Sequence, residues 1–87
     1  EIEIYAFSGE INFKVKNSSE VMDSLEKEYA SRGARIDRKE GIKAVFDSWW
    51  FLARVSNTEP ILRLVVEAAD KDEMKMRVEE LTHIINK

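Results

Sequence analysis

The sequence predicts an α+β domain: a four-stranded, mainly antiparallel sheet with two helices on one of its faces. Two segments repeat apolar residues at helical spacing, and each begins with a residue that suits a helix N-terminus. The other apolar segments are short and most of them alternate in polarity, as strands do. Each helical segment has one apolar stripe and the strands have one strongly apolar face. Packing both helices on one side of the sheet therefore buries all of these surfaces together.

The composition describes one small domain. The 87 residues are 44% hydrophobic and 36% charged, which suits a single core of sheet and helices. The net charge of -3, with the 14 basic residues dispersed along the chain, argues against a nucleic-acid partner. Cysteine is absent and no apolar run approaches the roughly 20 residues of a membrane helix, so we expect a cytoplasmic chain with no membrane partner. The chain starts at Glu1, without Met and inside an alternating pattern, which favours a piece of a longer protein.

The N-terminal segments predict strands. Residues 1–7 alternate between polar and apolar positions, and Ser8-Gly9 then breaks the pattern. Residues 10–16 resume it, with Ile11 among the inward positions, and form the first secure strand.

The first helix is predicted from Ser18 to Arg32. Asn17 precedes it as a capping residue, and Gly33 follows it as a C-terminal stop. Met22 and Tyr29 lie on its apolar stripe, so they are expected to contact the core rather than a ligand.

The middle of the chain predicts a run of strands. Residues 34–38 and 42–46 are separated by a polar turn, and they form either two short strands or one bent strand. A tight connection then leads into residues 49–55, which should pair with residues 42–46 as a hairpin. Because strand side chains alternate, Trp49 and Trp50 cannot both face the core.

The C-terminal third predicts a central strand and the second helix. Residues 61–69 are almost continuously apolar, as expected for a strand in the middle of a sheet. Asp70, Asp72 and Glu73 lie where a helix N-terminus attracts negative charge, so capping explains them better than a cation site. The only histidine, His83, is interpreted as a surface residue of this helix and not as a catalytic base. The buried stripe of the helix is predicted at Met74, Val78, Leu81 and Ile85.

A polar stretch between the last two predicted strands is the candidate functional site. A turn whose N–H groups point inward binds anions, and an arginine beside it matches a phosphate with two hydrogen bonds. Ser, Asn and Thr also cap turns by themselves, so on chemistry alone a plain turn explains the same residues equally well. The donors of this stretch are Arg54, Ser56, Asn57, Thr58 and Arg63.

The order of residues in this stretch is specific. Arg-x-Ser-Asn-Thr-Glu-Pro-x-Leu-Arg at 54–63, followed by Leu-Val-Val-Glu-Ala at 64–68, resembles the C-terminal phosphate-binding loop of the alpha-D-phosphohexomutases. This is the family of phosphomannomutase and phosphoglucomutase. The family often has Pro or Ala where this chain has Val55, so we expect a small adjustment of the turn.

The resemblance extends over nearly the whole chain. Residues 9–15 look like the strand that opens the last domain of that family, and residues 41–47 with Trp50 look like the segment that leads to the loop. The resemblance implies a fold similar to that of the TATA-box-binding protein. It also implies that residues 1–8 are an interdomain connection or a frayed strand, and that residues 9–87 are the phosphate-binding domain.

The resemblance implies a role within a larger enzyme. The family moves a phosphoryl group between the 1- and 6-positions of a hexose through a phosphoserine, with Mg²⁺ in a separate loop, and both belong to other domains. This chain would then have no catalytic residue, metal or cofactor of its own. Its partners would be a hexose phosphate and the other domains of the mutase. The implied contacts with the phosphate that is not reacting are Arg54 as charge partner, Ser56 and Thr58 as hydroxyl donors, and Asn57 as backbone or amide donor. Arg63 matches the edge of the motif but ranks last, because pairing with an acidic neighbour is its alternative role.

A stand-alone interaction module is the alternative from another class. Sheets with helices on one face often bind protein or RNA with the open face. The acidic charge weighs against RNA, whereas an exposed Trp49 or Trp50 on the open face would favour a protein partner.

Overall fold

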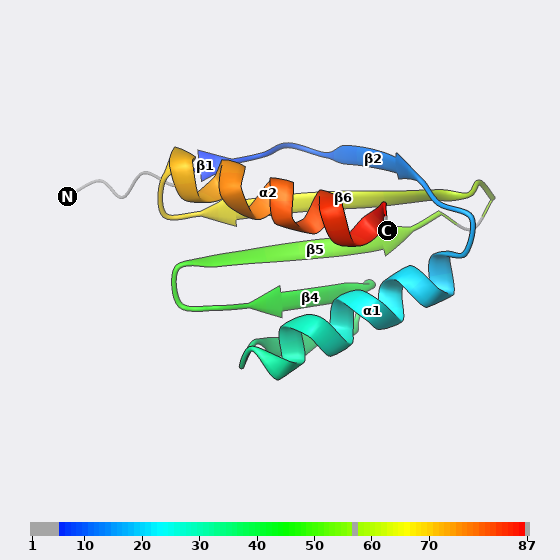
Figure 1. Ribbon diagram of the computed structural model, residues 1–87, viewed down its shortest axis with the longest axis horizontal. Helices are drawn as coiled ribbons and strands as arrows, with labels where there is room; N and C mark the ends of the chain where they lie inside the picture. Colours follow the sequence, from blue (N-terminus) through cyan, green and yellow to red (C-terminus); the bar gives the residue numbers. More distant parts are fainter. Residues whose placement is uncertain (1–5, 57, 87) are drawn as a thin grey trace.

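The structure is a computed structural model that describes residues 6–56 and 58–86. In this part of the chain, strands and helices are arranged as a single sheet with two helices in front of it (Figure 1). The predicted α+β class is therefore confirmed. The elements are β1 (Ala6–Phe7), β2 (Ile11–Lys14), α1 (Ser18–Ser31), β3 (Arg35–Asp37), β4 (Ile42–Val45), β5 (Trp49–Val55), β6 (Ile61–Ala68) and α2 (Lys71–Ile85).

The sheet is antiparallel at each described strand pair, in the order β1-β6-β5-β4-β3, and β2 also pairs with β6. The predicted count of four strands is wrong, because the described residues form six. One reason is that β1 and β2 lie end to end along the same edge of β6. Ala6 lies opposite Ala68 at one end of β6, and Ile11 lies opposite Leu64 further along.

The second reason is that the chain reverses between β3 and β4. Ile36 lies opposite Ala44, so the two segments are separate antiparallel strands and not one bent strand. The turn is supported by the Asp37 carboxylate, which accepts a hydrogen bond of 2.9 Å from the backbone N–H of Lys39. The predicted hairpin between β4 and β5 is confirmed, because the two strands are antiparallel neighbours with Val45 opposite Trp50.

Alternation assigns the two faces of the sheet. On β5, Trp49, Phe51 and Ala53 are buried, whereas the intervening Trp50 and Leu52 are half-buried on the other face. Both helices cover the first face (Figure 1). The second face, called the open face below, has no helix over it in the described residues.

The helices begin at their predicted caps. The Asn17 side chain accepts from the backbone N–H of Glu20 at 3.1 Å, and the Asp70 side chain accepts from that of Glu73 at 2.8 Å. Each bond satisfies an N–H group that has no partner within its helix. No helix formed by residues 6–56 and 58–86 has the length and apolar character needed to cross a membrane.

Tyr29 is the centre of the core. Its side chain is fully buried, and its ring makes edge-to-face contacts with Phe46, Trp49 and Phe51 at centroid distances of 6.1, 5.7 and 4.9 Å. Its hydroxyl donates a 2.8 Å hydrogen bond to Glu80 on α2. The residue therefore joins both helices to the sheet, and the core role predicted for it is confirmed.

The Tyr29 hydroxyl makes folding sensitive to alkaline pH. Burial, and then the hydrogen bond to Glu80, raise the pKa of Tyr29 above the value of about 10 that it has when unfolded. The folded state therefore holds this proton more tightly, so its contribution is fully present below about pH 10 and is lost as the pH rises further. We expect the free energy of unfolding to fall more steeply between about pH 10 and pH 12 in the unmodified chain than in Tyr29→Phe, measured by urea denaturation. Equal slopes in the two proteins would contradict this.

Candidate functional site

The candidate loop connects β5 to β6 at the end of the sheet where β2 leads into α1 (Figure 1). The backbone N–H of Ser56 donates to the carbonyl of Ile61 at 3.0 Å, which continues the ladder beyond the last paired residues of the two strands. On the other side of β6, the N–H of Val15 donates to the carbonyl of Pro60 at 2.9 Å. The loop is therefore tied to the sheet at both of its ends.

Arg54 and Arg63 form a cross-strand pair. The register of β5 and β6 places them directly opposite each other, and both side chains are exposed on the open face. Like charges at directly opposite positions are unfavourable in a sheet, and an anion between them would relieve the repulsion. Within the two described ranges, the ion pairs are made by Arg32, Arg38 and Arg77, and none involves Arg54 or Arg63.

Gly41 makes room for Arg54. It lies just before β4, at a φ of +125°, in a position where a Cβ atom would overlap the carbonyl oxygen of Ala53. The same Cβ would come within 2.9 Å of Cγ of Arg54. The stem of the arginine thus lies against a position that only glycine leaves open.

The hydroxyls of the loop lie close together. Ser56 Oγ is 3.4 Å from Thr58 Oγ1, and it accepts from the backbone N–H groups of Thr58 and Glu59 at 3.3 Å each. Ser56 therefore caps its own turn, as the plain-turn interpretation predicts. These bonds are at the long, weak end of the range for N–H to O hydrogen bonds. Two N–H groups consequently point at one acceptor position, which a stronger acceptor can take.

The structure brings together most of the predicted set. Arg54, Ser56, Thr58 and Arg63 gather around one end of the open face. Asn57, predicted as a backbone or amide donor, lies outside the described residues.

Two neighbours of this set were not among the predicted residues. Asn12 lies opposite Arg63, and Lys14 lies opposite Ile61, both exposed on β2. Their alternation indicated that they face outward, but only the pairing of β2 with β6 shows that they lie beside the loop.

Other residues singled out in the sequence lie elsewhere. Trp49 is buried in the core, whereas Trp50 is half-buried on the open face with the Lys43 ammonium 4.7 Å from its ring centre. His83 is exposed on α2, as predicted. Among the residues that the structure describes, no three His, Cys, Asp or Glu side chains are grouped so that they could hold a metal ion.

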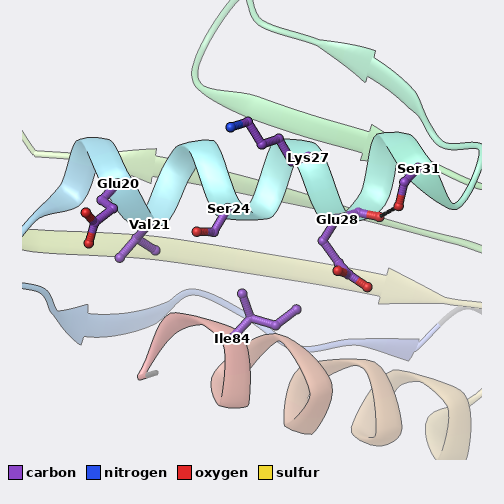
Figure 2. A pocket seen from close by; sticks show the side chains of 7 residues that line it. All are labelled: Glu20, Val21, Ser24, Lys27, Glu28, Ser31 and Ile84. Carbon is purple, nitrogen blue, oxygen red and sulfur yellow. Dashed lines mark hydrogen bonds between the residues drawn. The ribbon is translucent and has the colours of Figure 1, made fainter.

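A groove of about 550 Å³ runs between α1 and the C-terminal end of α2 (Figure 2). Figure 2 shows polar side chains of α1 on one side and Ile84 of α2 on the other. None of the predicted site residues lines this groove, so it is separate from the loop. Its lining consists of Glu20, Val21, Ser24, Lys27, Glu28, Ser31 and Ile84.

Fold and loop together define a small α+β domain that carries an arginine pair and a hydroxyl-bearing turn at one end of an open sheet face. A family model described as phosphoglucomutase/phosphomannomutase, C-terminal domain, matches residues 10–84. The chain belongs to this family, as the resemblance of its loop predicted.

Curated relatives agree with the family. The chain is 39% identical over 87 residues to a phosphomannomutase of Methanocaldococcus jannaschii, covering 100% of this chain and 19% of the relative. It is 41% identical over 85 residues to a phosphomannomutase of Vibrio cholerae, covering 97% of this chain and 18% of the relative. A Xanthomonas campestris protein described as phosphohexose mutases is 38% identical over 79 residues, covering 90% of this chain and 18% of the relative. The chain thus spans about a fifth of the length of these relatives.

Proposed function

We propose that this chain is the C-terminal domain of a phosphomannomutase or related phosphohexose mutase, and that its β5–β6 loop binds the phosphate that is not being transferred. The observation that carries the proposal is the pairing of Arg54 with Arg63 beside a turn whose N–H groups converge on one acceptor position. The substrate class rests on the relatives, which are named phosphomannomutases and phosphohexose mutases.

The loop offers a phosphate two kinds of contact. The Arg54 guanidinium can donate two parallel hydrogen bonds to phosphate oxygens, and Arg63 supplies a second positive charge from the opposite strand. A phosphate oxygen is a stronger acceptor than the Ser56 hydroxyl for the N–H groups of Thr58 and Glu59. The Ser56 hydroxyl can also donate its own proton to the phosphate, because accepting from N–H groups does not use that proton. Asn57 remains a predicted contact.

In this proposal the domain orients its substrate and does not carry out the transfer. Holding the distant phosphate converts binding energy into correct placement of the reacting group. The phosphoserine and the magnesium loop implied by the family belong to other domains, so the isolated chain should be inactive. The described residues contain no group of three His, Cys, Asp or Glu side chains that fits a magnesium ion. Because the loop is exposed, a bound phosphate stays partly hydrated and the affinity of the isolated chain should be about millimolar.

The proposal is tested by titrating the isotope-labelled chain with mannose 6-phosphate. We expect the largest amide shifts at Thr58 and Glu59, because their N–H groups change acceptor, and a smaller shift at Ser56, whose N–H stays bonded to the carbonyl of Ile61. Ser24, in the groove between the helices, should not respond. Mannose, which has no phosphate, is the control and should leave the loop unchanged. Shifts elsewhere with a flat response at Ser56 and Thr58 would place the ligand at another site.

The stand-alone interaction module is the weaker candidate. Its main support was an exposed tryptophan, but Trp49 is buried and Trp50 is half-buried beneath Lys43. Membership of the mutase family favours the phosphate site.

A further inference from the structure

Strand β2 places an additional cation beside the loop. Lys14 lies opposite Ile61 on β6, and Ile61 in turn accepts the hydrogen bond from the N–H of Ser56. Lys14 and Ser56 are therefore on opposite sides of the same residue. Two strand spacings separate them, which is about 10 Å between their backbones. The backbones are therefore too far apart for direct contact, but an anion bound in the turn lies within range of the Lys14 charge.

Lys14 continues the positive charge of the arginine pair. On β2, Asn12 lies opposite Arg63, and Lys14 is the next residue on the same exposed face. Lys14, like Arg63, takes no part in the ion pairs found among residues 6–56 and 58–86. The acidic side chain of the described part of the loop is Glu59, which is exposed. A chain with a net charge of -3 thus gathers positive charge at one corner of its open face.

We propose that Lys14 and Arg63 form an anion-capture strip, which attracts the dianionic phosphate group of a sugar phosphate toward the loop. Lys14 acts through its field from outside the final site, whereas Arg54 and the turn make the close contacts. The inference rests on the proposed function of the loop. Exposed charges of this kind raise the local concentration of an oppositely charged ligand, and salt screens the effect.

The expected size follows from the distance. A unit charge about 10 Å from a dianion in water changes the affinity about twofold at an ionic strength of about 50 mM. Lys14→Gln should therefore weaken phosphate binding about twofold, and Lys14→Glu, which reverses the charge, about fourfold. At about 500 mM the screening length falls to a few ångströms, so both differences should nearly disappear.

The test is a titration of the labelled chain with inorganic phosphate near pH 8, where the dianion predominates, at constant ionic strengths of about 50 and 500 mM. The amides of Ser56 and Thr58 report binding. Lys71→Glu is the matched control, because Lys71 is also exposed but lies at the start of α2, beyond the far end of β6. The expected result is that Lys14→Glu loses phosphate affinity at the lower ionic strength and not at the higher one. The amide shifts of its phosphate-bound loop should match those of the unmodified chain. Lys71→Glu should keep its full affinity.

Each other outcome overturns a defined step. Unchanged affinity in Lys14→Glu at the lower ionic strength would remove Lys14 from the strip. A loss that persists at the higher ionic strength, with altered bound-state shifts, would make Lys14 a direct ligand instead. An equal loss of affinity in Lys71→Glu would mean that the effect comes from the net charge of the chain and not from the position of Lys14. If the loop of the unmodified chain does not respond at all, the proposed function itself fails.

Discussion

Arg54→Gln, in a full-length mutase that carries this domain, is expected to lower kcat/KM for a hexose phosphate roughly tenfold or more, because a charged hydrogen-bond pair is lost from the site. The domain should remain folded. Arg54 is exposed, and its removal relieves the repulsion from Arg63 on the opposite strand. Steady-state kinetics with mannose 1-phosphate and thermal unfolding measure the two effects separately.

Two variants sharpen this experiment. Arg54→Lys keeps the positive charge but loses the planar guanidinium, so its kcat/KM should lie between those of the unmodified enzyme and Arg54→Gln. Arg35→Gln removes an exposed guanidinium from β3, the edge strand that β4 separates from β5, and should leave the kinetics unchanged. If Arg54→Gln retains full kcat/KM, Arg54 does not bind the substrate phosphate.

The parts of the fold that depend on local patterns could be predicted from the sequence. The caps at Asn17 and Asp70 and the alternation along β5 involve residues close in the chain. A few consecutive residues are therefore enough to predict them. The number of strands depended on distant pairings. Alternation predicted a strand at the N-terminus, but the sequence around Ala6 does not identify β6 as the strand that β1 pairs with.

The same distinction applies to the site. The spacing of the loop residues indicated a donor-rich turn, and the family resemblance indicated its ligand. Arg63 ranked last among the predicted contacts because pairing with an acidic neighbour was its alternative role, and the sequence of a strand does not reveal its cross-strand neighbour. The register places it directly opposite Arg54, and it places Lys14 on the next strand. The arrangement of charge around the loop is therefore a property of the sheet and not of the motif.

Gly41→Ala is expected to destabilise the chain by about 2–5 kcal/mol, because a strained backbone and a steric overlap act together. The new Cβ would overlap the Ala53 carbonyl oxygen and press on Cγ of Arg54. The carbonyl cannot move freely, because Ala53 is fully buried and pairs with both Ile42 and Leu64, so the exposed side chain of Arg54 is the neighbour that shifts. Where the chain still folds, displacement of Arg54 should also weaken the response of the loop amides to phosphate. Urea denaturation and the phosphate titration measure the two consequences.

Gly33→Ala separates the two causes of this destabilisation. Gly33 has a φ of +93°, but nothing lies within 4 Å of the position that its Cβ would occupy. This variant should therefore show only the backbone term, about 1–2 kcal/mol, and a normal phosphate response. The difference between the two variants measures the steric overlap at Gly41. Equal stabilities and equal phosphate responses would mean that the contact between Gly41 and Arg54 does not position the arginine.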